Sequence, residues 1–160
     1  MECRILEKGE FCVVGVKKRF STINNAQMQA IPKTWQELSD SKTGSFNKIL
    51  ALSDAQPPEY MGVMTDMTDD AFDYWFCVET TKTAPKDFST LVVPAATWAV
   101  FDSVGPMPTA IQNIWQNIFS DWLPNSGYEH AQAPEIEWYS SGDIKAEDFK
   151  SAVWIPVVKK

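Results

Sequence analysis

The chain has 160 residues, of which 44% are hydrophobic, and this is enough for one compact domain. Its 21 acidic residues outnumber its 14 basic residues, so the formal net charge of -7 argues against a nucleic-acid partner, which would need clustered lysine and arginine. No apolar run approaches the ~18 residues of a membrane-spanning helix, so we expect no membrane partner.

The three cysteines, Cys3, Cys12 and Cys77, have no C-x-x-C spacing and no signal peptide precedes them. This pattern fits reduced thiols and predicts a cytoplasmic protein. The single histidine, His130, lies in a polar stretch and is expected to be a surface residue. Scattered cysteines and one histidine predict no metal site, and the chain has no glycine-rich phosphate loop or nucleophile elbow, so no cofactor is expected.

In the first half of the chain, β-branched runs and helical spacing alternate. Ile31, Thr34, Trp35 and Leu38 recur at the spacing of an amphipathic helix. The pattern predicts strands at 11–20, 60–65 and 72–79, a short paired segment at 3–6, a helix that ends near 40 and a polar loop at 41–58.

The second half repeats this order. Residues 80–94 contain two prolines, Pro85 and Pro94, and two lysines, Lys82 and Lys86, and this composition predicts a hinge-like connection. Apolar residues from Ile111 to Trp122 keep helical rhythm and end at Pro124. The pattern predicts strands at 97–104, 135–140 and 152–158 and a helix at 111–122.

The repeat is also visible in individual residues. Ile31, Trp35 and Gln36 match Ile111, Trp115 and Gln116 at one constant offset, Trp75 matches Trp154, and Pro58-Glu59 matches Pro134-Glu135. We expect a single domain, 1–160, with half-repeats of about 1–80 and 95–160. The predicted fold is α+β: duplicated β-α-β-β units with pseudo-two-fold symmetry form an antiparallel sheet, with two main helices on one face and a central ligand cleft on the other.

The strand at 135–140 is unusual because it carries two carboxylates. Alternation puts Glu135, Glu137 and Tyr139 on one face, with Glu135 at the strand start where water is expected. In the last strand Val153, Ile155 and Val157 suit the underside of a helix, which sends Trp154 to the other face, and the repeat sends Trp75 with it. We expect Ile136 and Trp138 on the helix side, and Glu137 and Tyr139 in the cleft with Trp75 and Trp154. Trp98 is a further ligand-binding candidate.

A half-buried carboxylate between aromatic rings suits a flat hydrophobic cation. The positive charge of the ligand compensates the carboxylate for its lost hydration, and the rings add cation-π attraction. The residues alone leave a second interpretation open, in which Glu137 is an exposed rim residue and the tryptophans are core.

The order of motifs resembles that of a known family. The strand ending in Gly105-Pro106, the helix from Trp115 to Pro124, Ser126-Gly127-Tyr128-Glu129 and then P-x-x-E-x-Y at 134–139 are similar to the GyrI-like small-molecule-binding family. That family includes stand-alone gyrase-inhibitor-like proteins and the effector-binding domains of AraC-type and MerR-type multidrug-responsive regulators.

The resemblance implies a central cleft that binds hydrophobic, often cationic, compounds. The family's acidic residue carries over onto Glu137 and its tyrosine onto Tyr139. The aromatic residue of the last strand carries over onto Trp154, where a tyrosine is common, so the stacking face is kept and a hydroxyl is lost. With no helix-turn-helix ahead of the domain, a direct transcription-factor role is not expected.

Three functions follow as hypotheses. The first is a stand-alone protein that captures small hydrophobic or cationic molecules, as in multidrug binding or sequestration. The second is a hydrolase of strained, drug-like electrophiles, with Glu137 as general base and Tyr139 orienting a water. The third is an interaction module with a protein partner such as DNA gyrase or a regulator.

Overall fold

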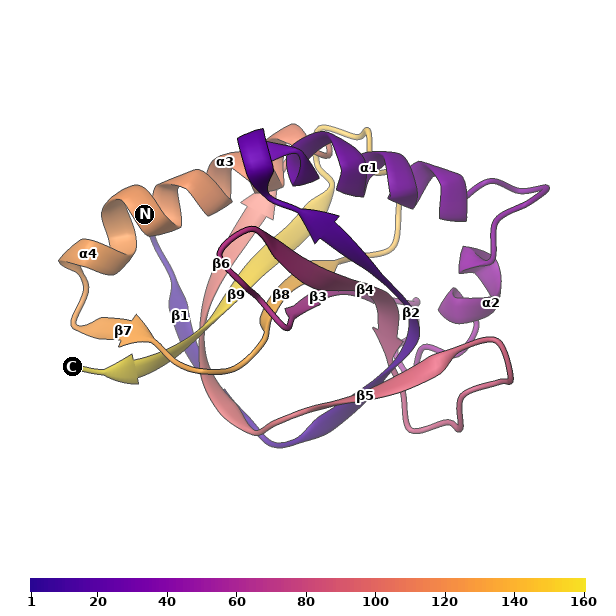
Figure 1. Cartoon of the computed structure of the whole chain (residues 1–160), viewed down its shortest axis with the longest axis horizontal. Coiled ribbons are helices and arrows are strands. Elements are labelled where there is room, and N and C mark those ends of the chain that lie inside the picture. Colours follow the sequence, from indigo (N-terminus) through magenta and orange to yellow (C-terminus); the bar gives the residue numbers. More distant parts are fainter.

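Nine strands and two principal helices build the protein, and the computed structural model describes the whole chain, residues 1–160 (Figure 1). The strands are β1 (Arg4–Lys8), β2 (Phe11–Ser21), β3 (Tyr60–Thr65), β4 (Ala71–Glu79), β5 (Ser89–Val93), β6 (Ala96–Val104), β7 (Tyr128–His130), β8 (Glu135–Tyr139) and β9 (Lys150–Lys159). The helices are η1 (Ile23–Asn25), α1 (Gln27–Leu38), α2 (Phe46–Leu50), α3 (Thr109–Asn117), the π-helical turn η2 (Ile118–Trp122) and α4 (Leu123–Asn125). The predicted α+β class with an antiparallel sheet is confirmed.

The sheet has the strand order β1-β6-β9-β8-β3-β4-β2-β5, every pairing is antiparallel, and β7 pairs with β9 beyond the end of β8. The strands β3 and β8 lie side by side at the centre. At the edges, β1 precedes β2 in the chain but pairs with β6, and β5 precedes β6 but pairs with β2. Each half of the sequence therefore completes the sheet edge of the other, while the half-repeats of about 1–80 and 95–160 stay a prediction.

Three short elements differ from the expectations. The predicted loop at 41–58 contains α2, the predicted hinge at 80–94 contains β5, and β7 was not predicted. All three are five residues or shorter. The single turn of α2 offers too few positions for a helical period to be recognised, and around β5 and β7 the flanking prolines gave the stronger turn signal.

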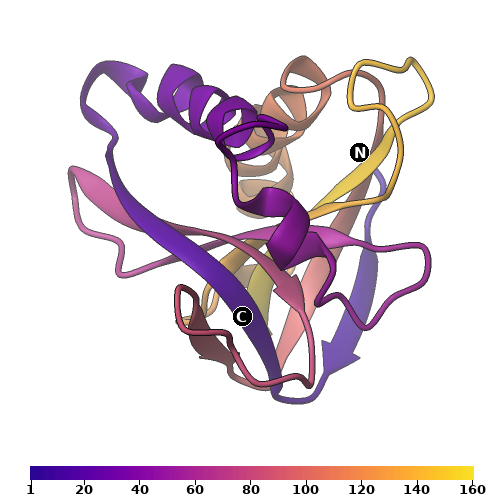
Figure 2. The same ribbon diagram turned by 90° about the vertical axis from the view of Figure 1, so that its right-hand side faces the viewer.

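The helices α1 and α3 lie over the same face of the sheet (Figure 2). Beneath α3, Phe101, Val153 and Ile155 are completely buried together with Ile118 from the helix end. The prediction that Val153 and Ile155 pack under a helix is therefore confirmed. None of these helices has both the length and the apolar character needed to cross a membrane.

The other face of the sheet encloses a second core. This core brings together Trp75, Trp98 and Trp154 with Val13 and Ile136. It joins residues of β2 and β6, which lie near opposite ends of the strand order, so the sheet must curl around it. The ring centroids of Trp98 and Trp154 are 6.0 Å apart. Three of the seven tryptophans are thus packing residues inside the curled sheet.

Phe101 gives a direct test of the core between sheet and helix. Its side chain is completely buried and meets the ring of Trp122 edge-on at 4.9 Å. We expect Phe101→Ala to lower the free energy of unfolding by about 3–5 kcal/mol, because the cavity would be only partly refilled. Val104→Ala on the same strand, at a side chain that is 64% exposed, is the control and should change it by less than about 0.5 kcal/mol in denaturant titrations. Equal losses would contradict this assignment of faces.

Candidate functional site

A large cleft of about 1460 Å³ opens between α1, α3 and the sheet face below them. Its walls include Trp35 and Trp115 from the helices and Tyr74, Glu137 and Tyr139 from the sheet. The cleft therefore lies on the helix face, and the predicted placement on the opposite face is wrong. Strand alternation determines which residues share a face, but it does not determine which face receives the helices.

Glu137 lies at the floor of the cleft and is 7% exposed. Two phenols donate to its Oε1: Tyr74 Oη, and Tyr139 Oη at 2.9 Å. The indole nitrogen of Trp115 donates to its Oε2 at 2.7 Å. The carboxylate is thus held by three neutral donors from β4, β8 and α3. Such donors compensate the loss of hydration that burial imposes on a charge.

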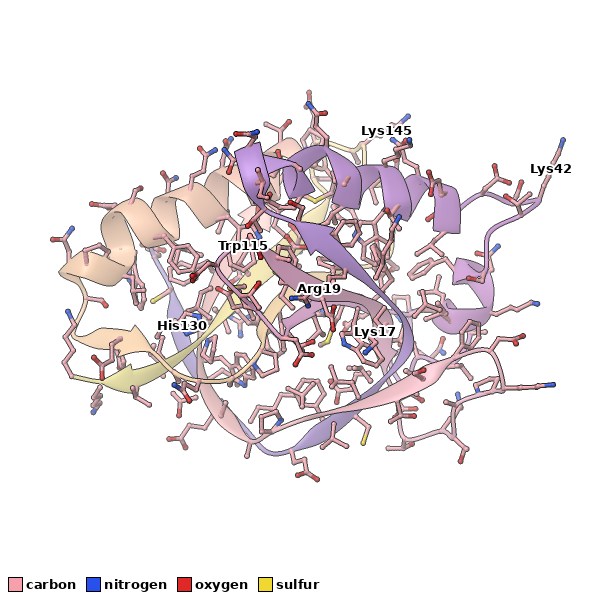
Figure 3. All side chains as sticks on the ribbon, viewed as in Figure 1. Lys17, Arg19, Lys42, Trp115, His130 and Lys145 are labelled. Carbon is pink, nitrogen blue, oxygen red and sulfur yellow. The ribbon has the colours of Figure 1, made fainter.

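A fourth donor extends this network to the other helix. Trp35 Nε1 on α1 donates to Tyr74 Oη at 3.1 Å. Trp35 and Trp115 are the two tryptophans that match in the sequence repeat, and Figure 3 shows Trp115 below its helix, toward the sheet. Each helix therefore contributes one indole to the same network. The repeat marked these residues, but their helical spacing suggested only a core role.

The space for Tyr74 depends on a glycine. Gly62 on β3 pairs directly with Glu137 on β8. A methyl group at Gly62 would overlap the phenol of Tyr74. Because the glycine has no side chain, Tyr74 can reach across β3 from β4 and donate to the carboxylate. A β-strand glycine often marks such a close approach.

Burial sets the protonation behaviour of the network. Loss of hydration raises the pKa of Glu137 above its ordinary value, whereas the hydrogen bonds from Tyr74, Trp115 and Tyr139 oppose this rise. Burial, and then the nearby charge of Glu137, raises the pKa values of Tyr74 and Tyr139 well above the usual phenol range. Both phenols therefore stay protonated and act as donors.

Glu135 is a second carboxylate of the cleft. The expectation that water surrounds it is wrong, because it is 6% exposed and lines the cleft. Its Oε2 lies 3.3 Å from Nε2 of His130, whose side chain is 36% exposed. The hydrogen bond to Glu135 raises the pKa of His130, against the opposing effect of burial. Glu59, its match in the repeat, is exposed and accepts from Trp138 Nε1 at 3.0 Å.

Aromatic rings form much of the remaining wall. Tyr60 stacks on Tyr139 with centroids 5.0 Å apart, and Trp115 stacks on Phe119 at 6.1 Å with planes only 4° apart. All four rings line the cleft. Burial raises the pKa of Tyr60 to about 12, so this phenol is neutral as well. The cleft thus combines flat apolar walls with an acidic floor.

The structure brings together only part of the predicted site. Glu137 and Tyr139 meet in the cleft, as expected. Trp75, Trp98 and Trp154 do not line it, because Trp75 pairs with Val63 and Trp154 with Ile136 on the opposite face. Placing Trp75 and Trp154 beside Glu137 was therefore wrong. No three His, Cys, Asp or Glu side chains are grouped so as to hold a metal ion.

A known protein family matches nearly the whole chain. The model of the GyrI-like small molecule binding domain matches residues 1–158. A comparison with curated proteins returns no match.

Among solved structures, SAV2435 bound to tetraphenylphosphonium has a TM-score of 0.84 at 19% identity, covering 99% of this chain and 94% of that chain. A protein from Staphylococcus aureus MU50 has a TM-score of 0.80 at 21% identity, covering 98% of both chains. The C-terminal domain of EcmrR has a TM-score of 0.62 at 20% identity, covering 99% of this chain and 98% of that chain. At these identities the three likenesses show a shared fold.

The role of Trp115 as a donor can be tested through its acceptor. Trp115→Phe keeps an aromatic ring but removes the bond to Glu137 Oε2, and this bond lowers the pKa of Glu137. We therefore expect the pKa of Glu137 to rise, as measured by carboxyl-carbon NMR titration. Trp122→Phe is the control, because Trp122 packs on Phe101 and makes no bond to Glu137. An unchanged or lower pKa in Trp115→Phe would refute the assignment.

Two of the cleft groups with raised pKa values, Glu137 and His130, predict how stability depends on pH between about pH 5 and pH 8. Folding raises the pKa values of both Glu137 and His130. At a pH above the ordinary pKa of each group, the native state therefore binds more protons than the unfolded state. Stability is then highest at low pH and is lost as pH rises through the folded values. We expect the midpoint temperature of thermal unfolding to decrease as the pH is raised from about 5 to about 8. His130→Gln should remove the part of this decrease that occurs above about pH 6.5. A midpoint that rises steadily across this range would count against both assignments.

Proposed function

This chain belongs to the GyrI-like family of small-molecule-binding domains, and on that premise we propose that it captures hydrophobic organic cations in the cleft between α1, α3 and the sheet. The observation that carries this proposal is the state of Glu137. Its carboxylate is buried at the floor of the cleft, its three partners are neutral donors, and none of the salt bridges of the structure includes it. The negative charge is therefore left for a ligand to balance.

The walls suit the apolar part of such a ligand. Trp35, Tyr60, Trp115 and Phe119 present ring surface to the cleft. Burying apolar ligand surface against them contributes a gross hydrophobic free energy of roughly 25 cal/mol per Å², from which the entropy cost of association is subtracted. A cation over a ring gains about 0.5–2 kcal/mol more. Flat walls with few fixed polar groups favour a class of compounds over one defined structure, which supports multidrug binding or sequestration as the finer function.

The similar structures support the same class. SAV2435, solved in complex with tetraphenylphosphonium, has the same fold along 99% of this chain. The cation in that complex is hydrophobic and carries its charge inside a shell of rings, which is the type of ligand that an acidic, aromatic cleft recognises. A cytoplasmic location, and a protein partner such as DNA gyrase or a regulator, remain predictions of the sequence.

The hydrolase alternative makes a stronger demand on Glu137. A general base must accept a proton from a bound water through a free, well-directed lone pair. Here Oε1 already accepts two hydrogen bonds and Oε2 accepts one. Tyr139, the residue expected to orient a water, donates to the carboxylate itself. This arrangement favours a fixed anionic charge over proton transfer.

Binding of tetraphenylphosphonium tests the proposal. Trp35 and Trp115 line the cleft, so the bound cation should change intrinsic tryptophan fluorescence. We expect saturable binding in the micromolar range, and at least about tenfold weaker binding by Glu137→Gln, which corresponds to roughly 1.4 kcal/mol. Neutral triphenylphosphine oxide should lose much less affinity on the same substitution.

Glu147→Gln is the matched control, because Glu147 is exposed and does not line the cleft. It removes the same charge from the protein and should leave the affinity for tetraphenylphosphonium unchanged. Equal weakening by both variants would mean that only net charge matters. No fluorescence change up to high micromolar cation, or equal affinity of Glu137→Gln and wild type, would overturn the proposal.

A further inference from the structure

The two carboxylates of the cleft differ in how they are compensated. Glu135 and Glu137 point to the same face of β8, and both are buried. Glu137 has three hydrogen-bond donors, which come from β4, β8 and α3. Glu135 has a single side-chain partner, the imidazole of His130. A buried carboxylate with one partner is poorly compensated unless that partner is charged.

His130 is a replaceable partner. It lies on β7, a strand of three residues, and its side chain is 36% exposed. Its Nδ1 is 2.6 Å from the carbonyl oxygen of Ala131, so that nitrogen is the donor there and Nε2 carries a proton to Glu135 only when the ring is protonated. The neutral ring would present an unprotonated nitrogen to Glu135. The ion pair therefore exists only in the imidazolium form.

We propose that Glu135 is a second cation subsite of the cleft and that His130 is its built-in counter-cation, which the second positive group of a dicationic aromatic ligand displaces. This inference rests on the proposed function, because it assumes that the first positive group binds near Glu137. The ligand class is narrowed from hydrophobic cations in general to compounds with an aromatic body and two positive centres.

The spacing of the subsites supports such a ligand. Residues two apart on one strand face are separated by about 6.5–7 Å. Phe119 stacks on Trp115 at 6.1 Å and on His130 at 6.4 Å, with planes inclined by 4° and 21°. Trp115 touches Glu137 and His130 touches Glu135. A continuous series of rings thus connects the two carboxylates along one wall of the cleft.

The pH dependence of the second subsite is expected to come from Glu135 and His130, and not from the other titratable groups around the cleft. Besides Glu135, Glu137 and His130, the titratable and charged residues that line the cleft are Tyr60, Tyr74, Tyr139, Asp143 and Lys145. Burial keeps the three phenols neutral by raising their pKa values. Lys145 lies well apart from His130 in Figure 3. Neither Lys145 nor Asp143 forms a salt bridge. On β7 itself, Glu129 is exposed and lies outside the cleft.

The proposal predicts a pH-dependent preference. Below the raised pKa of His130 the imidazolium occupies Glu135, and a second ligand charge must displace it. Above that pKa the subsite is free. Protonation of Glu137 at low pH weakens monocations and dications alike, so it largely cancels in a ratio of affinities. The ratio therefore isolates the contribution of Glu135 and His130.

Ethidium and propidium form a suitable probe pair, because both carry the same phenanthridinium ring and propidium adds a quaternary ammonium on a short chain. Their dissociation constants are measured by dye fluorescence with the full chain at pH 5.5 and pH 8. For wild type we expect the propidium preference to be about tenfold at pH 8 and to be lost at pH 5.5. Glu135→Gln should abolish the preference at pH 8. His130→Gln should keep it at pH 5.5.

Glu129→Gln, which removes a charge from the neighbouring exposed position, is the control and should behave as wild type. A propidium preference that survives in Glu135→Gln, or a pH dependence that survives in His130→Gln, would overturn the second subsite while leaving the proposed function intact. Binding of neither dye, together with no binding of tetraphenylphosphonium, would overturn both. Unfolded variants are recognised by the loss of the thermal transition, and His130→Gln tests the proposal independently of Glu135→Gln.

Discussion

The need to compensate one buried carboxylate organises this protein. A charge without hydration is costly, so Glu137 requires donors from several directions, and the structure provides them from β4, β8 and α3, with α1 supporting β4. The two helices and the central strands are therefore held in one geometry by the same network that gives the cleft its charge. None of the salt bridges of the structure includes Glu137, so its charge is compensated by neutral donors and not by a cationic side chain.

The sheet divides the aromatic residues of the chain into two groups with different roles. Trp75, Trp98 and Trp154 fill the inside of the curled sheet, where they bury apolar surface. Trp35 and Trp115 face the cleft, where each donates a hydrogen bond and still presents ring surface. The exchange of edge strands, β1 onto β6 and β5 onto β2, closes the first group away from solvent. The cleft can then stay open without exposing the main core.

The central strand pair shows how near-symmetry is broken to make an acidic site. Gly62 and Glu137 are directly opposed, and the missing side chain of one makes room for the phenol that binds the other. Two residues along β8, Glu135 is held in a different way, by an imidazole whose charge depends on pH. One carboxylate of the cleft is thus held by neutral donors, and the other is paired with a residue that can titrate.

The amino-acid sequence by itself determined the long elements, the antiparallel α+β class, the matching tryptophans of the two helices and the grouping of Glu137 with Tyr139. These follow from periodicity, which is a local property of the chain. The sequence did not show β5 or β7, because the prolines that flank these short strands gave the stronger turn signal, or α2, whose single turn offers too few positions for a helical period to be recognised. Only the tertiary structure decided that the helices cover the Glu137 side of β8, since alternation is silent on which face is covered. As a result, Trp75, Trp98 and Trp154 lie in the core. The cleft instead receives Tyr74 and Trp115, which are distant from Glu137 in sequence and meet it only when the sheet has formed.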